Sequence, residues 1–156
     1  MTQPDLERVN FSDVAQELQQ FYDALKEEKK TFELSFKLIQ ESHEAWVIRN
    51  ETKAIAGLSG LRKKWGCSIF YVVVNESEQG KGLGRLLTKK CLEQQHFMMP
   101  LLLSVENSNK KAQALYESLG MGKVLCLNSR TIMMQKAGPW RLLCYLSQFW
   151  TKGPSS

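Results

Sequence analysis

A segment rich in glycine and basic residues, at positions 79–85, carries the clearest chemical information in this sequence. Its residues are Gln79, Gly80, Lys81, Gly82, Leu83, Gly84 and Arg85. A glycine-dense turn that opens a helix presents unpaired backbone N–H groups and the positive end of the helix dipole, and both bind phosphate. Lys81 and Arg85 add cationic side chains suited to a polyphosphate or a ribose phosphate. The segment therefore predicts a phosphate-binding turn.

Two common nucleotide-binding motifs do not fit these glycines. A P-loop requires Gly-Lys followed by Ser or Thr, after four intervening residues, and the sequence lacks this arrangement. A dinucleotide fingerprint requires Gly-x-Gly-x-x-Gly, but its last place is Arg85 when counted from Gly80 and Leu87 when counted from Gly82. A glycine-rich turn between a strand and a helix, without any ligand, stays open as an alternative.

The elements on either side of this turn must position it. Alternating apolar residues predict three consecutive strands, at 45–49, 54–61 and 68–74. The stretches between them, 50–53 and 62–66, are short enough for tight turns, so we expect an antiparallel meander. A helix is expected from about Leu83 to Phe97, ending before Pro100. The glycines therefore lie between the last strand of the meander and the start of a helix.

The rest of the pattern predicts a mixed α/β fold. Upstream we expect a weak strand at 6–9, an amphipathic helix with apolar residues from Val14 to Leu25, and a second helix around 32–39, where a strand would also fit. Downstream we expect an apolar strand at 101–105 that is buried on both faces, a helix at 109–119, and a hairpin of strands at 124–127 and 131–135. The result is a largely antiparallel sheet of about six to seven strands with one central βαβ unit.

The composition is that of an ordinary globular domain. The chain has 156 residues, of which 43% are hydrophobic and 24% charged, so we expect one domain with one core. No apolar run is long enough to span a bilayer, and the N-terminus has no signal pattern, which predicts a cytoplasmic protein without a transmembrane segment. The formal net charge of +5 favours an anionic partner, either nucleic acid or a phosphate-bearing cofactor.

The cysteines and histidines do not form a metal-binding pattern. The four cysteines are Cys67, Cys91, Cys126 and Cys144. They lie far apart, without a Cys-x-x-Cys pair and without a histidine at metal-like spacing. We therefore expect reduced, mostly buried thiols and no bound metal.

The glycine-rich turn and a segment further along the chain together resemble one protein family. Residues 79–84 are similar to a signature of Gln or Arg, two residues, Gly, one residue, then Gly or Ala. Residues 109–121 are similar to the pattern Asn-x-x-Ala-x-x-Leu-Tyr-x-x-x-Gly-Phe, with Met121 in place of the aromatic residue. Both occur, in this order, in the GNAT superfamily of acyl-CoA-dependent N-acyltransferases. The chain departs from that pattern at Glu76, where proline is common, and at Gln79, where arginine is more common.

This resemblance implies a fold, a co-substrate and a set of binding residues. The sheet is expected to splay between the strand ending at Val74 and the next strand, with acetyl-CoA or another acyl-CoA in the gap. The pantetheine arm is expected on the backbone of Val72, Val73 and Val74, and the pyrophosphate on residues 79–85. Asn109 is expected to bind the cofactor or the adjacent strand, with helix capping as the alternative.

The resemblance also implies a catalytic residue. Tyr116 matches the position to which the family assigns the general acid that protonates the CoA thiolate. A phenol has an ordinary pKa of about 10, so it holds its proton at neutral pH and can donate it to a thiolate of similar basicity. Packing on the core is the alternative, because Tyr116 lies on the apolar stripe of its helix. No general base is identified, since Glu76, Glu78 and Glu106 are expected to be solvated.

The C-terminal residues lie outside the resemblance. Residues 137–156 contain an apolar helical pattern that begins near Pro139 and repeats at Leu142, Leu146 and Phe149. Docking on its own domain, a homodimer interface, a lid and attachment to a membrane surface all fit this pattern. We therefore divide the chain into a GNAT-like domain at 1–136 and a C-terminal apolar helical tail at 137–156.

The sequence as a whole predicts a cytoplasmic N-acyltransferase. It would move an acetyl or similar acyl group from acyl-CoA to a primary amine by direct attack, with Tyr116 as general acid. A non-catalytic acyl-CoA-binding regulatory module would keep the glycine turn without the acid, and the presence of Tyr116 argues against it. A nucleic-acid-binding protein is disfavoured, because basic and aromatic residues are not interleaved. The acceptor amine is not predicted.

Overall fold

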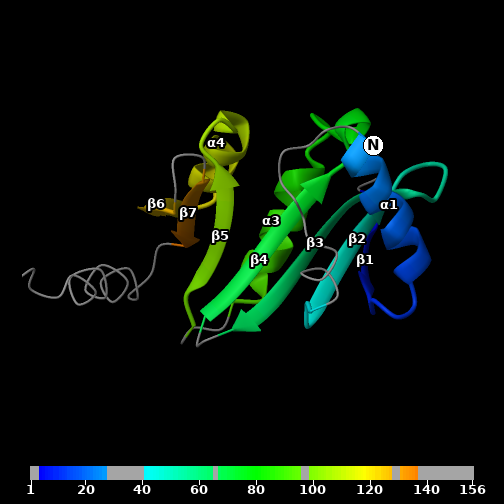
Figure 1. Ribbon diagram of the computed structural model, residues 1–156, viewed down its shortest axis with the longest axis horizontal. Helices are drawn as coiled ribbons and strands as arrows, with labels where there is room; N and C mark the ends of the chain where they lie inside the picture. The colour runs from blue at the N-terminus through cyan, green and yellow to red at the C-terminus, as the bar shows by residue number, and fades with distance from the viewer. Residues whose placement is uncertain (1–3, 28–40, 65–66, 96–98, 128–130, 137–156) are drawn as a thin grey trace, which may run out of the picture. The chain divides into compact units, whose positions relative to one another are not determined.

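The structure is a computed structural model that describes residues 4–27, 41–64, 67–95, 99–127 and 131–136 (Figure 1). The chain divides into two units. The first comprises residues 1–65 and 69–94, and the second comprises residues 66–68 and 95–156. Each unit has strands and helices of its own, and each is described by itself.

Four strands form the sheet of the first unit, in the order β1-β2-β3-β4. They are β1 (Leu6–Val9), β2 (Glu44–Arg49), β3 (Ile55–Lys64) and β4 (Cys67–Val74), and the first two residues of β4 group with the second unit. β1 pairs antiparallel with β2, and β2 pairs antiparallel with β3. Since only residues 65–66 separate β3 from its neighbour β4, these two strands also run antiparallel. The predicted meander is confirmed.

Helices α1 (Ala15–Glu27) and α3 (Leu83–Glu93) lie on opposite faces of this sheet (Figure 1). The alternation of side chains along β2 explains this arrangement. Ala45 and Val47 share a buried core with Leu18 and other apolar residues of α1. Trp46 points to the other face, where it lines a cavity together with residues of α3. The sheet therefore has side chains that face α1 on one side and side chains that face α3 on the other.

The second unit contains three strands, in the order β5-β7-β6, and helix α4. The elements are β5 (Leu101–Glu106), α4 (Lys110–Ser118), β6 (Met121–Cys126) and β7 (Thr131–Lys136). β7 pairs antiparallel with both neighbours, and the pair Leu103 and Met134 is buried. The mixed α/β class with seven mostly antiparallel strands is thus confirmed, as is the predicted order of elements within the described residues. The splay concerns the junction of the two units and stays a prediction.

Three predicted element boundaries are wrong. β3 continues to Lys64, because Arg62 forms an ion pair with Glu41 and the N–H of His43 donates to the carbonyl of Leu61 at 2.9 Å. The predicted turn at 62–66 therefore starts too early. α3 ends at Glu93 and not at Phe97, since the N–H of Gln94 turns back to the carbonyl of Cys91 at 3.2 Å. β6 begins three residues before the predicted start, at Met121.

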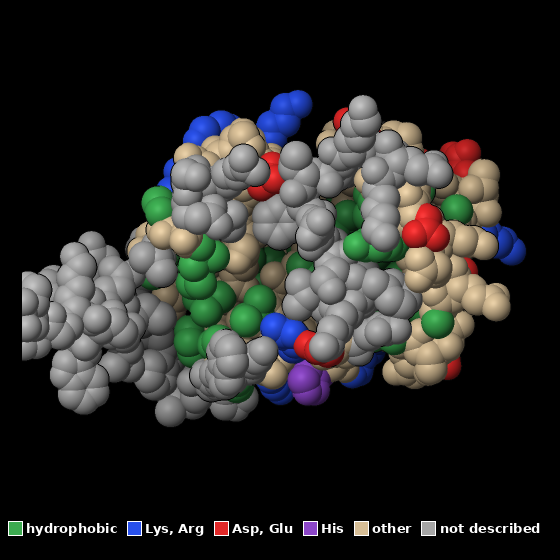
Figure 2. All heavy atoms as spheres, viewed as in Figure 1, with side chains coloured by type: hydrophobic (Ala, Val, Ile, Leu, Met, Phe, Trp, Pro, Cys, Tyr) green, Lys and Arg blue, Asp and Glu red, His purple; other side chains and the backbone are tan. Residues whose placement is uncertain are grey.

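The prediction that β5 is buried on both faces is also wrong. Leu101, Leu103 and Val105 are buried, whereas Leu102 is half-buried and Ser104 is exposed. Figure 2 shows hydrophobic side chains over β5 that are open to view. β5 therefore has one buried face, as is usual for a strand paired antiparallel with its neighbour.

Several predictions lie outside the described residues or are not tested. The second N-terminal helix at 32–39 and the tail at 137–156 belong to ranges that the structure does not describe. The domain boundary after residue 136 stays a prediction for the same reason. None of the described helices is long and apolar enough to span a bilayer.

The described cysteines differ sharply in exposure. Cys67, Cys91 and Cys126 are all free thiols, but only Cys91 is buried, so the prediction of mostly buried thiols is wrong for these three. Burial raises the pKa of Cys91 to about 12. Because the thiolate is the reactive form, we expect N-ethylmaleimide near neutral pH to modify Cys126 and spare Cys91. Peptide mass mapping measures both sites, with denatured protein as the control in which both react. Equal modification of the two in folded protein would contradict the structure.

Candidate functional site

The glycine-rich turn lies between a short helical segment that follows β4 and the start of α3. A short 3-10 helix, η1 (Glu76–Glu78), follows Asn75, whose side-chain oxygen accepts a hydrogen bond from the N–H of Ser77. The chain then turns, and the N–H of Gln79 donates to the carbonyl of Glu76 at 3.1 Å. These local hydrogen bonds end the strand and place the glycines in front of the helix.

Two glycines give this turn its shape. Gly80 has a φ of 84° and Gly82 a φ of 81°, which is the left-handed region where residues with a Cβ are strained. A Cβ placed on either glycine would have no heavy atom within 4 Å, so the space beside both is open. The glycines are therefore required by backbone conformation and leave room for a ligand.

The start of α3 is suited to a phosphate group. Its N-cap is Gly82, which has no side chain to accept hydrogen bonds from the first turn. The N–H groups of Leu83 and Gly84 occupy the first two helical positions, where α-helices offer no internal acceptor. The turn also carries the positive end of the helix dipole. The residues predicted to hold a pyrophosphate thus fit such a group.

Both basic side chains of the turn, Lys81 and Arg85, are exposed. Lys81 forms an ion pair with Glu78, with Nζ and Oε2 2.7 Å apart, and the Lys81 side chain is 59% exposed. Arg85 is exposed on the first turn of α3. A phosphate bound at Lys81 must therefore share this cation with the Glu78 carboxylate.

The hydrogen-bond direction along β4 separates the three predicted pantetheine residues. The N–H of Asn75 donates to the carbonyl of Ala56 on β3 at 2.9 Å. In an antiparallel pair, alternate residues direct their N–H and C=O groups to the same neighbour. Val73 therefore faces β3, whereas Val72 and Val74 direct their backbone groups to the opposite edge. This alternation favours Val72 and Val74 over Val73 as residues that could bind a cofactor.

Gln79 links the strand to the phosphate-binding turn. Its side-chain nitrogen donates to the carbonyl of Val74 at 3.3 Å. The first residue of the motif thus contacts the strand backbone through its side chain, while its own N–H stabilises η1. This contact joins the predicted strand residues, 72–74, to the predicted turn residues, 79–85, within the first unit.

The other two predicted site residues lie on α4, in the second unit. Asn109 caps this helix, since its side-chain oxygen accepts a hydrogen bond from the N–H of Ala112 at 3.0 Å. Helix capping, which the sequence left as the alternative, is therefore what the structure shows for this oxygen. Tyr116 is 8% exposed and lies in the last described turn of α4. Its burial fits both packing and catalysis.

Sequence reasoning missed two groups of residues near the site. Gln113 is a buried polar residue on the same side of α4 as Tyr116, and the sequence pattern gives no signal for it. Tyr71 precedes the predicted pantetheine residues on β4, and its phenol oxygen accepts a hydrogen bond from the Ser42 hydroxyl at 2.9 Å. A Cβ on Gly60 would lie 2.1 Å from the Tyr71 hydroxyl, so the phenol lies directly over this glycine. Burial raises the pKa of Tyr71, which keeps its phenol protonated.

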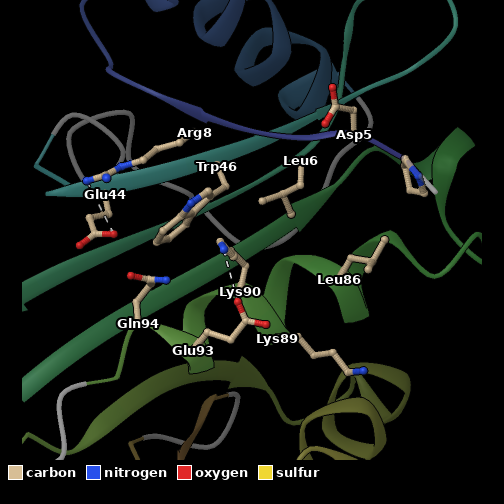
Figure 3. Close-up of a pocket in the computed structure, with 11 residues that line it drawn as sticks. Asp5, Leu6, Arg8, Glu44, Trp46, Leu86, Lys89, Lys90, Glu93 and Gln94 are labelled. Carbon is tan, nitrogen blue, oxygen red and sulfur yellow. Dashed lines mark hydrogen bonds and ion pairs between the residues drawn. The ribbon is translucent and has the colours of Figure 1, made fainter.

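A cavity of about 740 Å³ lies elsewhere in the first unit (Figure 3). It is bounded by β1 and β2 on one side and α3 on the other, and its apolar lining residues include Leu6, Trp46 and Leu86. Its walls carry ion pairs from Arg8 to Glu44, 3.9 Å apart, and from Lys90 to Glu93, 3.3 Å apart. None of the predicted site residues lines this cavity.

The described side chains do not suggest a metal centre. No group of three His, Cys, Asp or Glu residues in the described part of the chain could hold a metal ion.

Known protein structures share this fold. An acetyltransferase of the GNAT family from Streptococcus pneumoniae is 17% identical, with a TM-score of 0.68 over 86% of this chain and 99% of that chain. A ribosomal-protein alanine N-acetyltransferase from Escherichia coli is 19% identical, with a TM-score of 0.63 over 88% of this chain and 97% of that chain. A mutant form of the spermidine N-acetyltransferase from Vibrio cholerae is 18% identical, with a TM-score of 0.61 over 88% and 97%. At these identities the likeness shows the fold alone.

A family model decides the membership. No curated protein matches the sequence. The model of the acetyltransferase (GNAT) family matches residues 11–121, which is more than two thirds of the chain and includes the glycine turn and α4. The chain therefore belongs to the GNAT family of acetyltransferases.

Proposed function

We propose that this protein transfers an acyl group, in the simplest case acetyl, from acyl-CoA to a primary amine. The observation that carries the proposal is the pair of left-handed glycines, Gly80 and Gly82, in front of an uncapped helix start in a GNAT chain. This arrangement suits the pyrophosphate of CoA. Val72 and Val74 direct backbone groups to the edge of β4 that is opposite β3, and this alternation is the reason to propose them for the pantetheine amides.

The reaction needs few groups from the protein. The amine nitrogen attacks the thioester carbonyl, a C–N bond forms and the C–S bond breaks. In this proposal Tyr116 gives its phenolic proton to the departing thiolate and regains one from water, while the proton lost by the amine passes to water. A backbone N–H at Val74 would polarise the carbonyl oxygen. The proposed reaction uses no metal ion. The predicted location of the protein is the cytoplasm.

Binding of the co-substrate is the first test. A ligand that binds only the folded protein stabilises it by about 2.7 kcal/mol at 100 times its Kd. Acetyl-CoA at saturating concentration should therefore raise the Tm by several degrees, and dephospho-CoA and adenosine provide the comparison. An unchanged Tm with acetyl-CoA would overturn the proposal.

Turnover is the second test. The acceptors named for two similar structures, spermidine and a protein alanine, make a rational start for a screen of amines. Release of the CoA thiol in the presence of one amine class, together with the acylated product by mass spectrometry, would establish the activity. Binding of acetyl-CoA without turnover across all amine classes would favour the non-catalytic module.

The ion pair at Lys81 gives a prediction about affinity. Glu78→Gln removes a carboxylate beside the phosphate-binding turn and frees the Lys81 ammonium group. Since exposed ion pairs are worth up to about 1 kcal/mol, we expect the Kd for acetyl-CoA to fall about two- to fivefold, measured by calorimetry at low salt. Glu76→Gln is the matched control, because it removes the same charge from the same segment without changing the ion pair. An equal gain in both variants would assign the effect to net charge.

A further inference from the structure

Helix α4 contains a buried glutamine, Gln113, that takes no part in the reaction steps proposed above. Gln113 is 2% exposed, and it and Tyr116 are the buried residues of α4. The two positions are three residues apart, so both side chains lie on the same side of the helix. Gln113 is thus one turn away from the proposed general acid.

The amide of Gln113 ties the helix to the segment that precedes it. Its nitrogen donates to the carbonyl oxygens of Glu106 and Asn107, both at 2.9 Å. Glu106 is the last residue of β5, and its carbonyl also accepts a hydrogen bond from the N–H of Asn109 at 3.1 Å. Both hydrogens of the amide are therefore used to hold the turn between β5 and α4.

This second attachment restricts how α4 can rotate. The helix has 9 residues, a length at which isolated helices are unstable and tertiary contacts decide their position. The Asn109 cap fixes only the first turn. A helix held at one end can still rotate about its own axis, whereas attachment one turn later, through Gln113, fixes that rotation. The direction of Tyr116 depends directly on it.

Stability alone does not account for a glutamine at this position. The side-chain oxygen of Gln113 is buried, and within the described part of the chain it has no hydrogen-bond partner. A buried acceptor without a partner destabilises a protein by about as much as two ordinary hydrogen bonds stabilise it. The net gain in folding free energy from this amide is therefore small, and its effect must lie in geometry.

We infer that Gln113 is a positioning residue, whose amide holds α4 at the rotation that lets Tyr116 protonate the leaving thiolate. This inference rests on the proposed function and adds a residue that the family motif does not specify. Gln113 touches neither the thioester nor the amine in this scheme. It acts on the reaction only through Tyr116.

Two substitutions separate the amide donors from the shape of the side chain. Gln113→Met keeps a similar volume and removes both hydrogen bonds, so we expect kcat to fall about tenfold per folded molecule. Gln113→Lys keeps N–H donors that reach the same carbonyl oxygens, and it should retain more than half of the turnover. The KM for acetyl-CoA should stay within about twofold in both, because the phosphate-binding turn is not altered. Circular dichroism gives the folded fraction.

A double-mutant cycle with Tyr116→Phe tests the route of the effect. If Gln113 acts through Tyr116, Gln113→Met should change kcat less than about twofold in the Tyr116→Phe background. Equal effects in both backgrounds, or wild-type turnover in Gln113→Met, would overturn the inference and leave the proposed function intact. Wild-type turnover in Tyr116→Phe alone would instead remove the general acid itself. Should Gln113→Met not fold, the same cycle with Gln113→Lys and Gln113→Asn decides, since the shorter amide cannot reach the carbonyls.

Discussion

Gly82→Ala should weaken acetyl-CoA binding by about 100-fold and leave a folded protein. Gly82 has a φ of 81° and precedes the first N–H groups of α3. A methyl group here strains the backbone by about 1–2 kcal/mol, and relaxation of that strain turns the N–H groups of Leu83 and Gly84 away from a bound phosphate. Two charge-assisted hydrogen bonds are worth about 3 kcal/mol, which corresponds to roughly a factor of 100 in Kd. Calorimetry with acetyl-CoA measures the change.

The chain contains a matched control for this strain. Gly120 follows α4 with a φ of 84°, and a Cβ there would also have no heavy atom within 4 Å. Gly120→Ala should therefore lower the Tm by about as much as Gly82→Ala, a few degrees for strain of about 1–2 kcal/mol, while the Kd stays unchanged. If Gly82→Ala binds acetyl-CoA like the wild type, or if both variants lose affinity equally, the phosphate does not bind at the start of α3.

The fold was largely predictable because apolar periodicity determines which faces are buried. The apolar residues of α1 are an example, since Leu18, Phe21 and Leu25 recur at helical spacing and all three are buried. The end of β3 was not predictable in this way. Arg62 and Lys63 are polar, and they extend the strand through Glu41 and His43, which lie 20 or more residues earlier in the chain. Contacts between residues so far apart in the chain produce no periodic pattern in the sequence.

The site was predictable where a local motif requires a special backbone conformation. The motif around Gly80 and Gly82 already predicted a glycine turn, and the positive φ values are the physical reason for those glycines. The distinction between Val73 and its two neighbours depends on the pairing of β4 with β3, which three similar residues in a row cannot reveal. Gln113 was missed for the same reason, since its partners are backbone carbonyls of another element.

Gly57 and Gly60 show how pairing explains residues that lack a local role. Neither has a positive φ, and no motif contains them. A Cβ on Gly57 would lie 3.1 Å from the carbonyl oxygen of Val73, and one on Gly60 would overlap the Tyr71 phenol. β3 therefore carries glycines where β4, the strand proposed to bind pantetheine, needs space. These glycines let β4 pack closely against β3, and only the structure connects them to the site.

Tyr116→Phe should reduce kcat by about 100-fold, with the Kd for acetyl-CoA within about twofold of the wild type. General acid catalysis contributes roughly a factor of 100 to 10,000, and the lower end suits a thiolate, which leaves without protonation more readily than an alkoxide or an amide. Because Tyr116 is not part of the phosphate-binding turn at residues 79–85, loss of its hydroxyl should not remove any of the proposed pyrophosphate contacts. Continuous detection of the CoA thiol with a saturating amine measures kcat.

Tyr71→Phe distinguishes chemistry from packing in this experiment. It removes the same hydroxyl group from another phenol, a partly buried one on β4 that accepts a hydrogen bond from the Ser42 hydroxyl at 2.9 Å. Loss of a buried hydrogen bond should lower the free energy of unfolding by about 1–2 kcal/mol, while kcat per folded molecule stays near the wild-type value. If both variants slow turnover to the same extent, the effect of Tyr116 is one of packing. If only Tyr116→Phe is slow, its hydroxyl takes part in the reaction, because the loss of a phenolic hydroxyl is common to both variants.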